Sequence, residues 1–489
     1  MRPPARRAAL GAVLAVVAGA AALAPACALI VGSETITGDL IDAGHGGSTS
    51  STTTTTTTTT TVDAGGACAS SWLVKIDGKA GDVFLAVDEV SQHIFLAATV
   101  TGQVSVGAMP HPPKGGLLDT DILLVRYDEN GVAQWSRRYG TDGEERVKGL
   151  AFSASGRVIA AIEYQPAKGH GFGCSTGIDA GAGTFAAVVA LDPANGDCTS
   201  GSDLFFNPGS VVDLAVAPGS SEVWTAGVSS SNTLSIGHIA GPSIHGPALG
   251  GGSPAPNPIA ITVVDGVAVL AGGFSSSFAD YQGTASFPSS DGTDALLVRF
   301  KAVAPDKVYG DGGVAFTGAG YQAFHRVTSD GDAIFAVGEA AGSVDLGADA
   351  GALTAAGGRD VLVVKRGADL SPIWGARFGG AGNERGSVIA ARSGRVLIAG
   401  QHTGGFSIGD PLAAHGGEDV FVAALDDAAA GEPLWACSFG GANDDLVKAL
   451  RAVSGGLVIT GTFSGPANFG QAIDGGGDAI FVAKLTGGS

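Results

Sequence analysis

The sequence predicts an all-β protein made of seven repeats, each of four strands, on three observations. Glycine supplies 80 of the 489 residues, which suits a chain that turns often between short strands. A hairpin of two apolar strands recurs seven times along the chain. Further apolar runs, led by Asp or containing Trp, follow most of the hairpins. Four strands per repeat make one blade of a β-propeller, so we expect seven four-stranded blades.

Each hairpin joins two short apolar strands through a tight polar turn. The first strands contain, in order, Leu85, Leu150, Leu214, Ile261, Arg326, Val388 and Ala449. Successive hairpins are 61 to 65 residues apart, except after the third, where the interval is 47. Such regular spacing is typical of repeat architectures. The placement of the outer strands in the short third repeat stays open.

Two outer strands complete most repeats. One is an apolar run that begins with Asp121, Asp294, Asp360, Asp419 or Asp478. The other contains Trp135, Trp374 or Trp435, with Tyr or Phe four residues later. The seventh repeat has no Trp strand, but Trp72 and Ile76 show the same spacing ahead of the first repeat. We therefore expect the N-terminal strand to complete the last blade, which closes the ring and leaves no full sheet edge exposed.

The N-terminus has the features of an export signal. Arg2, Arg6 and Arg7 precede an apolar stretch, and Cys27 follows a small-residue cleavage site. Segment 1–26 resembles a bacterial lipoprotein signal peptide, which implies that Cys27 becomes the lipidated first residue of an exported cell-envelope protein. Ala28 resembles the residue found in the type sorted to the outer membrane. Ordinary cleavage near residue 26 is the alternative and gives a secreted protein.

Residues 27–67 are predicted to form a disordered tether, which leads to a propeller domain at 68–489. The tether contains ten consecutive Thr residues and is otherwise rich in Ser, Thr and Gly. Such a segment buries few apolar groups, so folding cannot offset the entropy of ordering it. We expect the protein to meet the membrane through its lipid anchor only.

The repeats resemble the bacterial secreted β-propeller-repeat family. The resemblance rests on the Asp-led strands, the Trp strands, and a Gly-Gly pair ahead of an acidic pair, as in segments 378–384 and 439–445. It covers residues 70–489 and implies a propeller fold. It implies little about activity, because propellers host both binding and catalysis.

The charge balance excludes one class of partner. Acidic residues outnumber basic ones by 46 to 27, and the net charge is −19. The sequence has no block of Lys or Arg, which a nucleic-acid-binding surface needs. We therefore expect no nucleic-acid partner, and we expect a monomer.

The cysteines indicate disulfides in an exported chain. Once Cys27 is set aside for lipidation, an even number remains: Cys68, Cys174, Cys198 and Cys437. Cys174 and Cys198 lie in the loops on either side of the Asp-led strand position in the second repeat, which favours a local bridge. Cys437 lies on the Trp strand of the sixth repeat, and Cys68 precedes the strand expected beside it. A second bridge between these two would lock the ring.

The residue types give few signs of catalysis. The nine His residues show no metal-ligand spacing, and no nucleophile motif occurs in a credible context, so we assign no catalytic residue. The Trp residues at 72, 135, 374 and 435 share one repeat position, which favours packing between blades over a stacking platform for sugars.

Acidic residues gather just before four of the seven inner strands. The seven positions hold Asp82, Glu145, Ser210, Asn257, Gln322, Glu384 and Asp445. One interpretation is that each carboxylate accepts backbone N–H bonds in its turn. The other is that Asp82, Glu145, Glu384 and Asp445 form an arc at the channel mouth. That arc would recruit Ca²⁺, or a basic patch on a partner, although no other cofactor is expected.

Together these features predict a cell-envelope lipoprotein that displays a seven-bladed propeller as a non-catalytic binding or scaffolding module. Its partner is expected to be a protein or a glycan at the cell surface. The alternative is a surface hydrolase or lyase that acts on polysaccharide, which would need a carboxylate pair converging on one face.

Overall fold

The computed structural model describes most of the chain after the predicted tether. The described residues are 68–165, 171–173, 185–204, 209–229, 232–239, 257, 259–279, 286–288, 292–304, 307–347 and 352–487. Within them every regular element is a β-strand and none is a helix, so the all-β prediction is confirmed. The predicted signal peptide, Cys27 and the tether lie outside these residues.

The first two repeats supply nine strands. They are β1 (Ser70–Val87), β2 (Ile94–Val106), β3 (Met109–His111), β4 (Thr120–Tyr127), β5 (Ala133–Tyr139), β6 (Arg146–Phe152), β7 (Val158–Tyr164), β8 (Phe185–Leu191) and β9 (Cys198–Leu204). The last four form a four-stranded sheet in the order β6-β7-β8-β9. The first five belong to a larger sheet that also includes the end of the chain.

The middle of the chain forms separate sheets. The strands of the third and fourth repeats are β10 (Gly209–Val216), β11 (Val223–Ser229), β12 (Leu234–Ile239), β13 (Ile259–Val264), β14 (Val267–Phe274), β15 (Phe278–Ala279), β16 (Ser286–Phe287), β17 (Asp294–Ala304) and β18 (Lys307–Phe316). Three described strands, β10-β11-β12, make the sheet of the short third repeat. The fourth repeat has the order β13-β14-β17-β18, with β15 and β16 as a small extra pair.

The last three repeats follow the same plan. Their strands are β19 (Gln322–Ser329), β20 (Ala333–Asp345), β21 (Ala352–Gly367), β22 (Pro372–Phe378), β23 (Glu384–Arg392), β24 (Arg395–His402), β25 (Phe406–Ile408), β26 (Asp410–Leu412), β27 (Asp419–Asp426), β28 (Glu432–Gly441), β29 (Leu446–Val453), β30 (Gly456–Asn468) and β31 (Ala472–Leu485). The fifth repeat is the sheet β19-β20-β21-β22. Strands of the sixth and seventh repeats join β1 to β5 in one twelve-stranded sheet.

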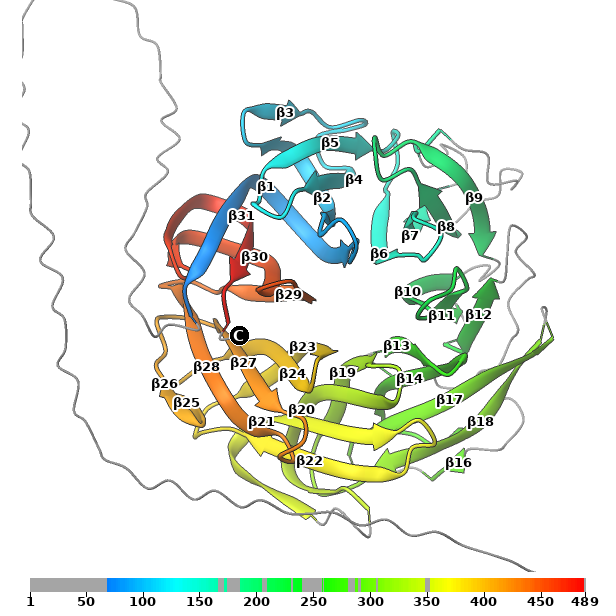
Figure 1. Ribbon diagram of the computed structural model, residues 1–489, viewed down its shortest axis with the longest axis vertical. Coiled ribbons are helices and arrows are strands. Elements are labelled where there is room, and N and C mark those ends of the chain that lie inside the picture. The colour runs from blue at the N-terminus through cyan, green and yellow to red at the C-terminus, as the bar shows by residue number, and fades with distance from the viewer. Residues whose placement is uncertain are drawn as a thin grey trace, which may run out of the picture. The chain divides into compact units, whose positions relative to one another are not determined.

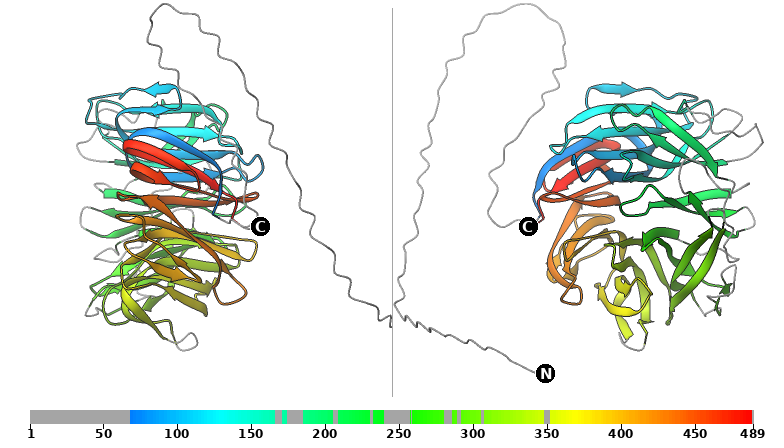
Figure 2. Two further views of the ribbon diagram at one scale, coloured as in Figure 1. Left: turned by 90° about the vertical axis from the view of Figure 1, so that its left-hand side faces the viewer. Right: turned by 45° about the vertical axis from the view of Figure 1, so that its right-hand side comes forward.

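The first strand takes part in two repeats. Its first half pairs antiparallel with β31, with Trp72 opposite Lys484 and Ile76 opposite Ile480. Its second half pairs with β2, and register shifts near Asp77 and Ala80 separate the two halves. Figure 2 shows the blue N-terminal strand beside the red β31. The strand that contains Trp72 therefore pairs with the Asp478 strand of the last repeat.

The sheets stand around a common centre, and the first strand of each hairpin is innermost (Figure 1). Apolar side chains fill the space between neighbouring sheets. Phe335 and Trp374 of the fifth repeat, for example, belong to one buried cluster with Phe406 and Phe421 of the sixth. The Asp-led strands are apolar and buried over their central residues, as in segments 122–125 and 361–364, because they are covered on both faces there. This packing and the antiparallel sheets make the fold a β-propeller.

The Trp strands bind the neighbouring repeat, as the packing interpretation predicts. The indole Nε1 of Trp135 donates to the carbonyl of Pro193 at 3.1 Å, and that of Trp374 donates to the carbonyl of Asp427 at 3.2 Å. In both cases the acceptor lies in the turn between the third and fourth strands of the next repeat. Packing between repeats therefore explains these tryptophans.

The predicted disulfide between Cys68 and Cys437 is confirmed. The two Cα atoms are 5.6 Å apart, and the bond joins the residues just before β1 to β28 across 369 positions of sequence. Cys198 is the first residue of β9 rather than a loop residue. Cys174 lies outside the described residues, so the bridge between Cys174 and Cys198 stays a prediction.

Candidate functional site

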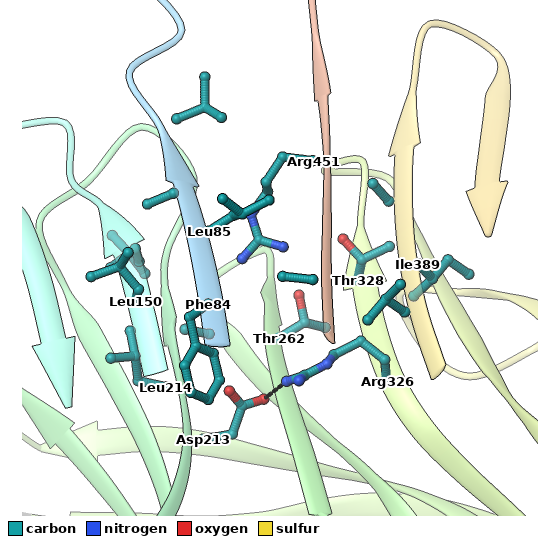
Figure 3. Close-up of a pocket in the computed structure, with 18 of the residues that line it drawn as sticks. Phe84, Leu85, Leu150, Asp213, Leu214, Thr262, Arg326, Thr328, Ile389 and Arg451 are labelled. Atoms are coloured by element: carbon teal, nitrogen blue, oxygen red, sulfur yellow. Dashed lines mark hydrogen bonds and ion pairs between the residues drawn. The ribbon is translucent and has the colours of Figure 1, made fainter. Parts of the chain in front are cut away.

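A cavity of about 330 Å³ lies between the innermost strands (Figure 3). Side chains from one strand of each repeat line it, namely from β1, β6, β10, β13, β19, β23 and β29. Most of the lining residues are apolar in type, and Leu85, Leu150 and Leu214 contribute from the same position of the first three hairpins. The first strands of all seven hairpins thus converge on one site.

An ion pair crosses the cavity. The Nη1 atom of Arg326 on β19 lies 2.9 Å from Oδ2 of Asp213 on β10, and the two residues are 113 positions apart. The same Oδ2 atom accepts the backbone N–H of Ile261 on β13 at 3.0 Å. Asp213 is 4% exposed. This carboxylate therefore ties together the inner strands of three successive repeats and fixes the position of Arg326.

Two further basic side chains line the cavity. Arg451 on β29 donates one hydrogen bond, from Nη1 to the carbonyl of Leu450 at 2.9 Å. Burial, with repulsion from Arg326, lowers the pKa of Arg451 to about 10. Lys448 lies on the same strand, and no hydrogen bond or ion pair joins it to any residue that the structure describes. Glu89 lines the cavity as well, from an exposed position after β1.

Three of the four predicted acidic site residues are turn residues. Glu145, Glu384 and Asp445 are fully buried, and each carboxylate accepts the backbone N–H of the residue four positions before it. The distances are 3.0 Å, 2.9 Å and 2.7 Å, to the amides of Thr141, Gly380 and Gly441. Burial raises the pKa of each of the three carboxyls. The geometry matches the interpretation in which the carboxylate stabilises the turn.

Asp82 differs from the other three. Its side chain is 48% exposed, and Oδ2 lies 3.2 Å from Nζ of Lys148. Asp82 lies inside the long strand β1, so no turn precedes it as one precedes Glu145, Glu384 and Asp445. Within the described ranges, no group of three or more His, Cys, Asp or Glu side chains is arranged to hold a metal ion. Calcium binding by the predicted arc therefore stays a prediction, and this geometry gives it no support.

A second carboxylate lies next to Asp445. Asp419, the first residue of β27, contributes to the raised pKa of Asp445, and both carboxylates face Gly440. The Oδ1 atoms of Asp419 and Asp445 are buried without a hydrogen-bond partner among the described residues. This pair lies inside a turn rather than on an open face, so it differs from the pair that a polysaccharide hydrolase needs.

The sequence interpretation missed the charged residues of the cavity. Asp213, Arg326, Lys448 and Arg451 each interrupt an inner strand that is otherwise mainly apolar. A charged residue in the first strand of a hairpin is the signal that could have drawn attention to them. Their convergence was not visible, because they come from three repeats of different local sequence.

Comparisons with known proteins add a likeness of fold at low identity. No protein-family model matches the sequence, and no curated protein matches it. Similar solved structures include the WD40 domain of Pan2 from Neurospora crassa, 9% identical, with a TM-score of 0.41 over 83% of this chain and 89% of that chain. The β-propeller domain of Cps50 (Swd1) from Myceliophteria thermophila is 10% identical, with a TM-score of 0.40 over 83% of this chain and 98% of that chain.

A third similar structure is PpgL, the periplasmic gluconolactonase of Pseudomonas aeruginosa. It is 12% identical, with a TM-score of 0.40 over 77% of this chain and 98% of that chain. The fold assigned here rests on the strand pairing of this chain, and membership of the secreted β-propeller-repeat family stays a prediction. In the part of the chain that the structure describes, no helix is long and apolar enough to cross a membrane.

Proposed function

We propose that this chain is a cell-envelope lipoprotein that presents a seven-bladed β-propeller as a binding or scaffolding module. The observation that carries the proposal is the single cavity that receives side chains from the inner strands of all seven repeats. Small-molecule sites are concave and are equipped with a few polar groups that converge, and this cavity has those two properties.

The seven-bladed arrangement is supported by the order of the strands. Each of the seven hairpins provides an innermost strand, and the N-terminal half of β1 supplies an outer strand beside β31. The disulfide between Cys68 and Cys437 holds the start of β1 to the sixth repeat. In this proposal the first and last segments of the chain share one blade and close the ring.

The location at the cell envelope is inferred from the sequence. Cys27 follows a signal-like segment, and a Thr-rich tether separates it from the propeller. Expression of the full chain in a Gram-negative host, followed by membrane fractionation, tests this part. We expect the parent chain in the membrane fraction and the Cys27→Ser variant in the soluble fraction, because one residue carries the acyl chains. Unchanged fractionation of the variant would contradict lipid anchoring.

The binding role is tested by comparing binding with turnover. The purified full chain is screened against cell-surface polysaccharides, first for degradation and then for saturable binding. Saturable binding of a surface glycan or protein without turnover supports the proposal. Depolymerisation of any polysaccharide would overturn it in favour of the hydrolase or lyase.

A further inference from the structure

We propose that the central cavity binds a small organic anion, whose carboxylate or phosphate group is held by Arg451 and Arg326 with Lys448 beside them. The inference rests on the proposed binding function and names the class of ligand. Figure 3 shows both arginine side chains extending into the same space between the inner strands.

The charge of the cavity is opposite to that of the protein. The chain as a whole carries a net charge of −19. The charged side chains that line the cavity are three basic residues, Arg326, Lys448 and Arg451, against Asp213 and Glu89. Glu89 is exposed, so water screens its charge. An acidic protein that collects basic groups in one enclosed place has a site suited to an anion.

The one buried carboxylate that lines the cavity, that of Asp213, already accepts two hydrogen bonds. Oδ2 of Asp213 accepts from both Arg326 and the amide of Ile261, at 2.9 Å and 3.0 Å. Asp213 forms its ion pair with Arg326 and attracts Arg451 only from a distance, because no ion pair joins Arg451 to a described residue. Arg451 is partly buried, so a bound anion would supply the counterion that its partly desolvated guanidinium group lacks.

Arg451 also has donors to spare. A guanidinium group has five N–H donors, and the one hydrogen bond that Arg451 makes to a described residue goes to the carbonyl of Leu450. Guanidinium groups bind carboxylates and phosphates through two parallel hydrogen bonds. The hydroxyl groups of Thr262 and Thr328 line the same space and can bind further oxygen atoms of a ligand.

The size and the walls limit the rest of the ligand. A volume of about 330 Å³ is near the lower end for small-molecule sites, so the ligand is a small molecule rather than a polymer. Leu85, Leu150 and Leu214 contribute apolar groups to the walls of the cavity. The fitting ligand therefore has one anionic group and a short apolar or hydroxylated body.

Calorimetric titration of the full chain with three probes tests the inference. Butyrate supplies a carboxylate on an apolar body, butyramide has the same shape without charge, and inorganic phosphate supplies the other anion. We expect saturable binding of butyrate or phosphate at millimolar concentration and none of butyramide. Butyrate alone would identify a carboxylate ligand, and phosphate alone a phosphorylated one. Equal binding of butyrate and butyramide, or saturation by neither anion, would overturn the inference.

Variants of Arg451 test whether the anion binds in the cavity. Arg451→Gln should weaken the binding of the anion at least tenfold, because the group that lacks a counterion is lost. Arg451→Lys keeps the positive charge but lacks the paired donors, so it should weaken binding less than Arg451→Gln does. It also tests the site if the Gln variant does not fold. Arg146→Gln is the control, because Arg146 also lies on an inner strand but does not line the cavity. Unchanged affinity for the anion in both folded Arg451 variants would refute the site. Membrane anchoring and glycan binding test the proposed function separately.

Discussion

The indole Nε1 of Trp72 donates a hydrogen bond of 3.0 Å to the carbonyl oxygen of Glu129. Trp72 lies at the start of β1, and Glu129 lies in the turn between β4 and β5 of the first repeat. The same relationship joins Trp135 to Pro193 and Trp374 to Asp427. The N-terminal strand thus contacts the first repeat as the Trp strands of the first and fifth repeats contact the repeats that follow them.

Each of these indoles packs against a glycine in that turn, which predicts the effect of adding one methyl group. At Gly431 a Cβ atom would lie 2.8 Å from Cζ3 of Trp374, and φ is 78°. Gly431→Ala should therefore cost about 2–4 kcal/mol, from the left-handed backbone and the overlap together. Urea denaturation measures the loss.

Gly394→Ala is the matched control for that substitution. Its φ is 76°, and a Cβ atom there meets nothing within 4 Å. It should lose only about 1 kcal/mol, the cost of the backbone conformation. Equal losses in the two variants would mean that contact with Trp374 does not limit position 431.

The pairing between β1 and β31 predicts a large effect of a short N-terminal deletion. Removal of residues 70–78 exposes the edge of β31 and deletes the buried Ile76. We expect a loss of about 5 kcal/mol or more, together with a tendency to associate through the free edge. Thermal melting and gel filtration measure both effects.

A deletion of nine residues from the Thr run, 52–60, is the control and should leave the melting temperature unchanged. If the chain without residues 70–78 stayed monomeric and melted within a few degrees of the parent, the N-terminal strand would not complete the last blade.

The disulfide predicts a dependence on reductant. The bond between Cys68 and Cys437 closes a loop of 369 positions, and it restricts the unfolded chain far more than the folded one. Replacing both cysteines by Ala should lower the free energy of unfolding by about 2–4 kcal/mol. Dithiothreitol should produce a similar loss in the parent. A double variant as stable as the oxidised parent would show that the bond does not stabilise the native state.

The sequence predicted the strands better than it predicted the site. The hairpins and the Asp-led strands follow from local patterns, because each depends on residues at a regular spacing. The link between Cys68 and Cys437 followed from the expected place of the N-terminal strand. Asp82 was misplaced because the alignment of the hairpins assumes a turn before it, whereas β1 runs unbroken from Ser70 to Val87.

The cavity could not be predicted for a different reason. Asp213 and Arg326 meet across 113 positions of sequence, and their contact depends on how the inner strands are arranged about the centre. Which side chains of an inner strand face the cavity also depends on bulges, such as the one between Val211 and Asp213. Alignment of the repeats identifies equivalent positions, but it does not show which of them face inward.

The pair of Asp419 and Asp445 predicts a pH dependence. Burial, with a contribution from Asp419, raises the pKa of Asp445 from 3.8 to about 6. The folded protein therefore holds this proton more tightly than the unfolded chain, and its contribution to stability falls as the pH rises from about 4 to about 6. Asp445→Asn keeps an oxygen acceptor for the amide of Gly441 and removes the charge. Relative to that of the parent, the free energy of unfolding of the variant should rise by about 1–3 kcal/mol between pH 4 and pH 7, since one pKa unit is worth about 1.4 kcal/mol.

Denaturation at several pH values, with and without Ca²⁺, distinguishes this from the metal interpretation. Asp82→Asn is the control, because its half-exposed carboxylate pairs with Lys148 and its loss should cost at most about 1 kcal/mol. If Ca²⁺ stabilised the parent at pH 7 but not Asp445→Asn, the carboxylates would be cation ligands. If the Asn variant were less stable than the parent by the same amount at pH 4 and pH 7, Asp445 would be an ordinary turn residue without a raised pKa. The expected result is a difference that changes with pH and is indifferent to calcium, because burial raises the pKa of Asp445 and its carboxylate stabilises the turn through the amide of Gly441.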